Sequence, residues 1–275
     1  MRVTVFGLGE AGSLFAAGLV AAGARVDGYD PAPVETPEGV TRWADPVSAV
    51  TGAELVFALT ASADAEVALT QALGAIPASA LYADLSTSAP VLKRRLAAIA
   101  AGRGLEFVDI ALMAIVPTHG LRTPALASGT GADRYVRTMT SFGVLVEAVG
   151  ERPGDAATRK LLRSVMMKGL AALVIEAMRA ADAAELSDWL WSNLVEEITA
   201  ADGKMLARLV TGTGAHAERR LHEMEACQAL LEGLGVDPVM TRSTVESLRR
   251  VPSEGLPSLP LRNGGAQTGM PSSSQ

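Results

Sequence analysis

Three glycines near the start of the chain carry the first chemical signal. They belong to a G-x-G-x-x-G pattern made of Gly7, Leu8, Gly9, Glu10, Ala11 and Gly12. An apolar run over residues 2–6 precedes the pattern and a helical run over 11–22 follows it. In such a strand–turn–helix unit the glycines permit the tight turn, the approach of a pyrophosphate to the backbone and close helix–strand packing. Because the N–H groups at a helix N-terminus attract phosphate, the pattern predicts a dinucleotide site.

An acidic residue stands where such a site would hold a ribose. Asp30 follows the second apolar run, 18 residues after the last glycine of the pattern. A carboxylate near this spacing accepts hydrogen bonds from the ribose 2′-hydroxyl and repels a 2′-phosphate. Pro31 and Ala32 come next, so no arginine directly follows to hold such a phosphate. We therefore expect NAD, with NADP as the alternative, and we expect Thr60, after the apolar run 55–59, to border the cofactor.

The elements that must position these residues alternate along the first 150 positions. Short apolar runs separated by helical patterns indicate a parallel sheet that is covered on both faces. The predicted strands are 2–6, 24–29, 55–59, 81–85, 106–110, 125–128 and 144–149, and the helices between them are 11–22, 63–72, 89–101 and 132–142.

The pattern changes after residue 150. Residues 156–186 predict one helix about 45 Å long, and further helical patterns follow at 189–200, 202–210, 215–234 and 241–251. The fold class is therefore an α/β Rossmann-type nucleotide-binding domain over 1–153, joined by a long interdomain helix to an all-α domain over 154–251. Residues 252–275 are rich in proline, glycine and serine, which predicts a disordered tail.

Composition excludes several functions. The 275 residues carry a net charge of −6, so the positive field of non-specific nucleic-acid binding is missing. One cysteine, Cys227, and three histidines without ligand spacing argue against a disulfide framework and a metal site. No run is long and apolar enough to span a membrane, and the N-terminus lacks signal-peptide features. We expect a cytoplasmic protein that acts on a small molecule.

Two later motifs extend the argument. Residues 84–90 read DLSTSAP and residues 154–160 read GDAATRK. Together with the glycine pattern, they stand in the order found in β-hydroxyacid dehydrogenases, a superfamily that includes 3-hydroxyisobutyrate and 6-phosphogluconate dehydrogenases. The chain resembles this superfamily over residues 1–250. It looks most like a phosphogluconate-dehydrogenase-like branch with a short helical C-terminal domain, which shares stretches similar to residues 216–225 and 235–238.

The resemblance implies roles for several side chains. Lys160 matches the catalytic lysine, and Ser86 and Thr87 match residues that contact substrate or nicotinamide. Ser164 and Lys168 share a helix face with Lys160 at helical spacing and are further candidates for substrate binding. A lysine suits the chemistry, because hydride leaves a carbinol carbon only as the hydroxyl loses its proton, and the reverse step must return that proton.

One stretch departs from the superfamily pattern. Met113, Ala114 and Ile115 stand where relatives carry Ser-Gly-Gly backbone groups that hold a substrate carboxylate. We expect Met113 to line an apolar substrate wall. The leading interpretation is an NAD(P)-dependent oxidoreductase acting on a hydroxyl or carbonyl group of a hydroxyacid-like substrate, with Lys160 as general acid/base.

Two alternatives stay open. An imine reductase shares the predicted layout and favours NADPH; the apolar wall supports it, whereas Asp30 and Lys160 argue against it. A dinucleotide-binding protein without catalysis is the other. His216, Arg219 and Arg220 form either a solvated helix face or an anion contact. Because the long helix has more apolar surface than one chain covers, we also expect a homodimer.

Overall fold

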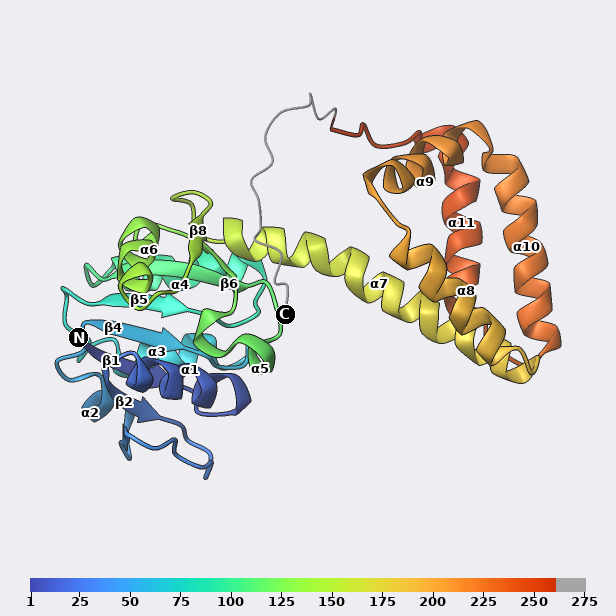
Figure 1. Cartoon of the computed structure of the whole chain (residues 1–275). Coiled ribbons are helices and arrows are strands. Elements are labelled where there is room, and N and C mark those ends of the chain that lie inside the picture. The colour runs from blue at the N-terminus through green and yellow to red at the C-terminus, as the bar shows by residue number, and fades with distance from the viewer. Residues whose placement is uncertain (261–275) are drawn as a thin grey trace. The chain divides into compact units, whose positions relative to one another are not determined.

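The computed structural model describes residues 1–260 and divides into two compact units (Figure 1). The first comprises Met1–Met166 and the second begins at Met167. The division runs through helix α7 (Asp155–Ala183), whose first 12 residues belong to the first unit. The boundary expected from the sequence, at 153/154, lies just before this helix.

The first unit is built on an eight-stranded sheet with the order β3-β2-β1-β4-β5-β6-β7-β8. The strands are β1 (Arg2–Phe6), β2 (Arg25–Tyr29), β3 (Val40–Arg42), β4 (Leu55–Ala58), β5 (Leu81–Asp84), β6 (Glu106–Leu112), β7 (Ala125–Ser128) and β8 (Val146–Ala148). Parallel pairing dominates, as a Rossmann-type domain requires. This arrangement confirms the predicted fold class for the first unit.

Two details of the sheet differ from expectation. Strand β7 pairs with β6 in antiparallel register, with Ile110 opposite Ala127. The connection over residues 113–124 holds only a short helix α5 (Val116–His119) and a 3₁₀ turn, so it reverses the chain instead of crossing over the sheet. The sequence also gave no signal for β3, because that strand has three residues and none of them is buried.

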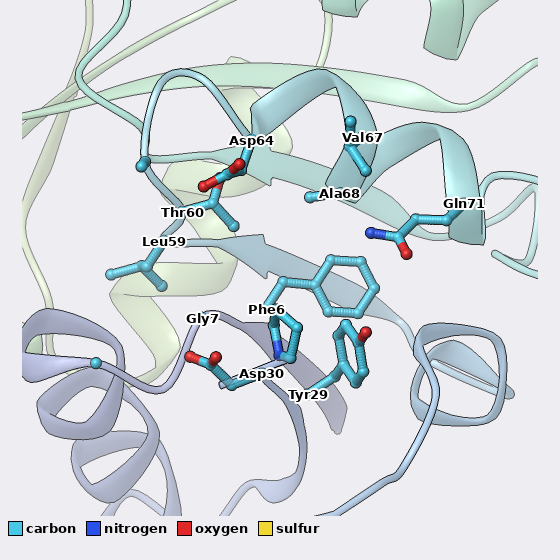
Figure 2. A pocket seen from close by; sticks show the side chains of 13 residues that line it. Phe6, Gly7, Tyr29, Asp30, Leu59, Thr60, Asp64, Val67, Ala68 and Gln71 are labelled. Carbon is cyan, nitrogen blue, oxygen red and sulfur yellow. The ribbon is translucent and has the colours of Figure 1, made fainter. Parts of the chain in front are cut away.

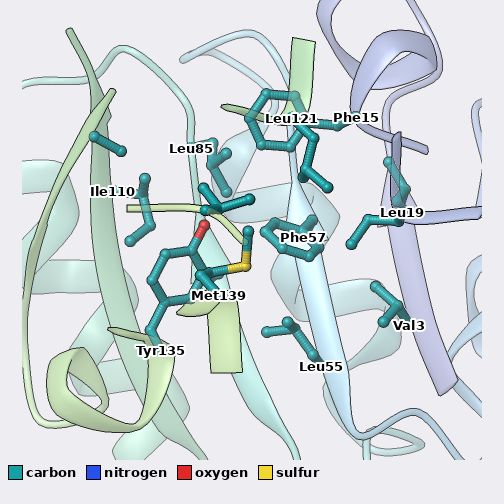
Figure 3. Packing of buried hydrophobic residues seen from close by; sticks show 14 of the residues in the cluster. Val3, Phe15, Leu19, Leu55, Phe57, Leu85, Ile110, Leu121, Tyr135 and Met139 are labelled. Carbon is teal, nitrogen blue, oxygen red and sulfur yellow. The ribbon is translucent and has the colours of Figure 1, made fainter. Parts of the chain in front are cut away.

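Helices cover both faces of the sheet, as predicted. They are α1 (Glu10–Ala21), α2 (Pro46–Val50), α3 (Ala65–Ala72), α4 (Pro90–Ala101) and α6 (Ala132–Ser141). One core lies under α1 and α6, where Phe57 makes edge contacts with Phe15 and Tyr135 (Figure 3). The other lies under α2, α3 and α4. Residues 55 and 57 of β4 face the first core while 56 and 58 face the second, which is the period-two alternation of a strand buried on both sides.

The second unit contains only helices. After α7 come α8 (Ser187–Thr199), α9 (Gly203–Ala215), α10 (Ala217–Gly233) and α11 (Val239–Glu254), and α10 packs along α11. Helix α11 continues for three residues beyond 251, where the tail was expected to begin. Gly255, with φ of +72°, closes the helix, and Pro252 is accommodated in its last turn. Residues 255–260 of the predicted tail form no helix or strand, and residues 261–275 lie outside the described residues. Within residues 1–260 no helix has the length and apolarity needed to cross a membrane.

Candidate functional site

The residues predicted to form the site follow the carboxyl ends of parallel strands. Gly7 follows β1, Asp30 follows β2, Thr60 lies just after β4, Ser86 just after β5 and Met113 directly after β6. Because these strands are parallel neighbours, their carboxyl ends lie along one edge of the sheet. Open α/β sheets bind their ligands at this edge, where the strand order reverses direction. Here the reversal falls between β1 and β4.

Each of the three fingerprint positions is occupied by glycine for a different structural reason. Gly7 has a φ of +83°, and a Cβ on it would lie 2.4 Å from the carbonyl oxygen of Leu59. A Cβ on Gly12 would lie 1.8 Å from the carbonyl oxygen of Gly7. A Cβ on Gly9 would have no heavy atom of the described residues within 4 Å. Gly7 and Gly12 therefore maintain the turn and the packing of α1, whereas Gly9 leaves open space above the N-terminus of that helix.

A cavity of about 410 Å³ opens beside this turn (Figure 2). Its walls are the glycine turn, the end of β2 and the segment that leads from β4 into α3. Phe6 and Tyr29 form an apolar side with their rings edge to face at 5.9 Å, and Val67 and Ala68 of α3 line the cavity as well. Asp30 lies at the cavity next to Gly7 (Figure 2). The cavity thus combines an apolar surface, the two carboxylates of Asp30 and Asp64, and a helix N-terminus.

Asp30 is held by the main chain. Its Oδ2 accepts a hydrogen bond from the N–H of Leu8 at 2.7 Å, and its Oδ1 accepts one from Ala32 at 2.8 Å. Each carboxylate oxygen has a second lone pair, so the group can still accept hydrogen bonds from a sugar hydroxyl. The main-chain contacts fix its position at the rim of the cavity.

An arginine that the sequence analysis did not single out lies beside this loop. Arg42 of β3 donates to the carbonyl oxygens of Asp30 at 3.0 Å and Ala32 at 2.5 Å, and also to that of Val34. The residues directly after Asp30 do not predict it, because Arg42 is 12 positions away, on the strand that had no sequence signal. Its guanidinium stabilises the loop that carries the carboxylate.

Thr60 has an unmet hydrogen-bonding capacity. Its Oγ1 is buried and has no hydrogen-bond partner among the described residues. Thr60 lines the same cavity as Asp30 and Gly9. Leaving a buried hydroxyl without a partner costs free energy, so a polar ligand group or a water at this point would be favoured. This orphaned hydroxyl and the open space at Gly9 both fit a phosphate-containing ligand in the cavity.

The two superfamily motifs meet at the same edge of the sheet. Nζ of Lys160, in the second turn of α7, donates a hydrogen bond to Oγ1 of Thr87 at 2.9 Å. Thr87 is exposed, whereas its neighbour Ser86 is only 3% exposed. The Ser86 hydroxyl is bonded inside the protein, to Asp84 at 2.9 Å and Ser88 at 2.7 Å. Of the two candidate hydroxyls, Thr87 is therefore the one that faces outward beside the lysine.

The remaining candidate substrate residues are Met113, which follows β6, and Ser164 and Lys168, which lie along α7. Met113 is half-buried, and its carbonyl oxygen accepts a hydrogen bond from Arg163 at 3.0 Å. Ser164, also half-buried, lies one helical turn after Lys160. Lys168 belongs to the second unit, and its part in the site stays a prediction.

A buried lysine lies beneath the motif at residues 84–90. Lys93 of α4 is fully buried, and its Nζ lies 2.8 Å from Oδ2 of Asp84 and 3.1 Å from Oδ1 of Asp109. None of the sequence motifs predicts a role for Lys93. A signal existed, because Lys93 shares a helix face with Leu96 and Ala100, both of which are buried.

Two further residues that the sequence singled out, Arg220 and Cys227, lie in the helical unit. Arg220 donates to Oγ1 of Thr213 at 2.5 Å and to the carbonyl oxygen of Leu209 at 3.3 Å, so it links α10 to α9. Cys227 is half-buried and unbridged. Within residues 1–260 no group of three or more His, Cys, Asp or Glu side chains could hold a metal ion.

Two parts of the chain match known family models. Residues 2–113 match the NAD binding domain of 6-phosphogluconate dehydrogenase, and residues 181–251 match a domain of unknown function, DUF1932. An uncharacterised 28.5 kDa protein of Methanothermus fervidus is 26% identical over 175 residues. That match covers 62% of this chain and 66% of the relative, slightly under two thirds of its length.

Comparison with solved structures covers nearly the whole chain. The conserved protein MTH1747, of unknown function and structurally similar to 3-hydroxyacid dehydrogenases, is 25% identical with a TM-score of 0.58, over 91% of this chain and 96% of that one. An imine reductase from Myxococcus stipitatus in complex with NADP⁺ is 18% identical with a TM-score of 0.78, over 93% and 95% of the two chains. At that identity the second likeness concerns the fold alone.

The Rossmann-type sheet, the glycine fingerprint and the helical second unit define a nicotinamide-dinucleotide-binding oxidoreductase. Within that class, the two family matches and the likeness to MTH1747 support the β-hydroxyacid dehydrogenase superfamily.

Proposed function

We propose that the protein is an NAD-preferring dehydrogenase that oxidises a hydroxyl group, or reduces the corresponding carbonyl, with Lys160 as the general acid/base. The observation that carries the proposal is the 2.9 Å hydrogen bond from Nζ of Lys160 to Oγ1 of Thr87. It joins the two motifs that the superfamily shares, at the edge of the sheet that also carries Gly9 and Asp30.

The proposed chemistry divides between cofactor and protein. The nicotinamide supplies hydride in reduction and takes it in oxidation. Lys160 gives a proton to the oxygen of the substrate in the first case and removes it in the second. Thr87 accepts a hydrogen bond from Nζ and so orients the amine toward the substrate. Met113 and its neighbours add an apolar surface near this point, which favours a substrate with a hydrocarbon part.

The preference for NAD rests on Asp30. Its fixed carboxylate can accept hydrogen bonds from the 2′-hydroxyl of the adenosine ribose and would repel a 2′-phosphate. Arg42 is the arginine beside the loop, and its guanidinium is engaged with three main-chain carbonyls. A 2′-phosphate would have to break these hydrogen bonds to pair with it. The geometry therefore supports NAD.

Titration with NADH and with NADPH, followed by cofactor fluorescence, tests this assignment. Tighter binding of NADH is expected. Preference for NADPH would contradict the role given to Asp30. Binding of neither cofactor would contradict the proposed function as a whole.

Reduction of a C=N bond is the second candidate. The apolar stretch Met113–Ile115 supports it, because a polar anchor for a substrate carboxylate is missing there, and the Myxococcus stipitatus neighbour is an imine reductase. A panel of hydroxyacids, ketones and one cyclic imine, each with NADH and NADPH, separates the two. Turnover of the imine with NADPH alone would establish the second candidate. Turnover of hydroxyacids with NAD would establish the first.

The helical unit supports a homodimer. No residue of α8 is buried in the part of the chain that the structure describes, although the helix carries Trp189, Trp191, Val195 and Ile198. These side chains are between 48% and 64% exposed. Such an apolar surface favours association with a second copy. Light scattering is expected to give twice the chain mass of 28.4 kDa, and a monomer at micromolar concentration would contradict this expectation.

A further inference from the structure

The buried lysine of α4 joins two carboxylates from neighbouring strands. Lys93 Nζ lies 2.8 Å from Oδ2 of Asp84, at the end of β5, and 3.1 Å from Oδ1 of Asp109, in β6. It also donates to the main-chain carbonyl oxygen of Asp84 at 3.0 Å. All three side chains are fully buried. The strands are adjacent and in register, with Asp84 opposite Asp109.

One carboxylate holds the loop that presents Thr87. Oδ2 of Asp84 accepts a hydrogen bond from the Ser86 hydroxyl at 2.9 Å, and Oδ1 accepts one from the N–H of Ser86 at 3.3 Å. The Ser86 hydroxyl also lies 2.7 Å from that of Ser88. The residues on both sides of Thr87 are therefore tied to the carboxylate that Lys93 holds.

The other carboxylate holds the helix that presents Lys160. Oδ2 of Asp109 accepts hydrogen bonds from the N–H groups of Gly154 at 3.2 Å and Ala157 at 3.0 Å. These groups lie at the start of α7, where main-chain N–H groups have no partner within the helix. A strand residue thus caps the helix, and Ala157 lies three residues before Lys160.

The charges explain why a cation is required between Asp84, which holds the loop of Thr87, and Asp109, which holds the start of α7. Two carboxylates with one ammonium give the cluster a net charge of minus one, and the positive end of the α7 dipole compensates it. Without the ammonium, two buried carboxylates would face each other across adjacent strands and repel. The repulsion would push the loop of Asp84 away from the helix end held by Asp109.

We infer that Lys93 is a positioning residue: by bridging Asp84 and Asp109 it sets the distance between Thr87 and Lys160. This inference rests on the proposed function only for its catalytic meaning. The geometric claim concerns the reactivity of Lys160 and can be measured without a substrate.

The test is acetylation of Lys160 by limiting acetic anhydride, quantified by peptide mass spectrometry in the intact protein. Thr87→Val removes one hydrogen-bond acceptor of Lys160 directly and should raise the acetylation rate about fivefold, the effect of losing one hydrogen bond of ordinary strength. The pair Lys93→Met with Asp109→Asn should raise it to a similar extent. This pair removes the bridge but keeps the net charge of the cluster, so it avoids the two unpaired carboxylates that Lys93→Met alone would leave.

Non-additivity separates positioning from a general structural effect. If Lys93 acts through the Thr87–Lys160 contact, adding Thr87→Val to the Lys93/Asp109 pair should cause no further rise in the rate. Arg94→Met is the matched control, because Arg94 is the exposed neighbour on the same helix, and it should leave the rate unchanged. NADH affinity should stay within about twofold in the Lys93/Asp109 pair and in Arg94→Met, since the cofactor cavity is lined by other residues.

Several outcomes overturn the inference. The first is an unchanged acetylation rate of Lys160 in the folded Lys93/Asp109 double variant. The second is a further rise in that rate when Thr87→Val is added to the double variant. The third is failure of the charge-balanced double variant to fold. The last would show that the contact between Lys93 and Asp109 holds the fold and not only the geometry of the site. Failure of the proposed function is recognised separately, as turnover that survives Lys160→Met, and does not alter the acetylation result.

Discussion

Alanine at two glycines of the fingerprint should separate ligand binding from folding. Gly9 and Gly12 belong to the same turn and helix start, but their surroundings differ. A Cβ at Gly12 would lie 1.8 Å from the carbonyl oxygen of Gly7, whereas at Gly9 no heavy atom of the described chain lies within 4 Å. Gly12→Ala should therefore destabilise the protein, and Gly9→Ala should weaken cofactor binding without unfolding it.

The magnitudes follow from these distances. The carbonyl of Gly7 must move by at least about 1.2 Å before its separation from a Cβ at Gly12 reaches 3.0 Å. Overpacking costs about 1–3 kcal/mol, and a contact of 1.8 Å with a backbone oxygen places this case in the upper part of that range, about 2–3 kcal/mol. The helix preference of alanine returns about 1 kcal/mol. A net loss of about 1–2 kcal/mol corresponds to a fall in Tm of about 2–8 °C. At Gly9 the methyl group would occupy the phosphate approach, and losing one charge-assisted hydrogen bond raises the Kd for NADH by about tenfold or more.

Thermal unfolding and NADH fluorescence titration of both variants measure these effects. The expected result is a lower Tm for Gly12→Ala, and a weaker NADH affinity at nearly unchanged Tm for Gly9→Ala. Gly39→Ala is a useful control for loss of a glycine, because Gly39 has a φ of +79° but does not line the cavity. It should lower Tm and leave NADH affinity intact. Wild-type affinity in Gly9→Ala would refute the placement of the pyrophosphate, and an unchanged Tm in Gly12→Ala would refute the packing argument.

Three further predictions concern single side chains. Asp30→Ala should shift the ratio of NADH to NADPH affinity toward NADPH by about tenfold, since a carboxylate that repels a 2′-phosphate is removed; an unchanged ratio in paired titrations would contradict the assignment. Lys160→Met should lower turnover by about 10²–10⁴-fold with NADH affinity retained, and near-normal turnover would remove this lysine from the mechanism. Burial alone would raise the pKa of Glu176. Hydrogen bonds from the Thr241 hydroxyl and from the N–H groups of Met240 and Thr241 outweigh this effect, so the pKa is lowered below the ordinary 4.5. The carboxylate therefore stabilises the helical unit above about pH 4.5, and this contribution is lost as the pH falls through the lowered value. Glu176→Gln should make the urea midpoint less dependent on pH in that range, and an identical dependence would contradict the role.

Local patterns were sufficient for much of the first unit. The apolar run, glycine spacing and helical period of residues 2–22 predicted β1, the turn and α1, because each depends on contacts between near neighbours. The same holds for α7, whose predicted start differs from the observed one by a single residue. The family resemblance of the DLSTSAP and GDAATRK motifs assigned a binding role to Thr87 and a catalytic role to Lys160, and the structure brings their side chains into contact.

Contacts between residues far apart in the sequence could not be predicted from local patterns. The direction of β7 depends on a connection that turns back instead of crossing, and its residues look like those of a parallel strand. Ser86 and Thr87 are adjacent in sequence with similar chemistry, yet only Thr87 is exposed. Arg42 lies beside the Asp30 loop only because β3 pairs with β2.

The sequence alone thus determined the fold class and the glycine turn after β1, since periodicity and turn chemistry are properties of short segments. The pair of motifs came from the resemblance to a family. The tertiary structure decided which polar groups are buried together. Lys93, Asp84 and Asp109 come from three different elements, and Asp109 caps a helix that begins 46 residues later. Their charges are tolerable inside the protein only because all three meet there with the N-terminus of α7, a requirement of electrostatics in a dry interior that no local pattern encodes.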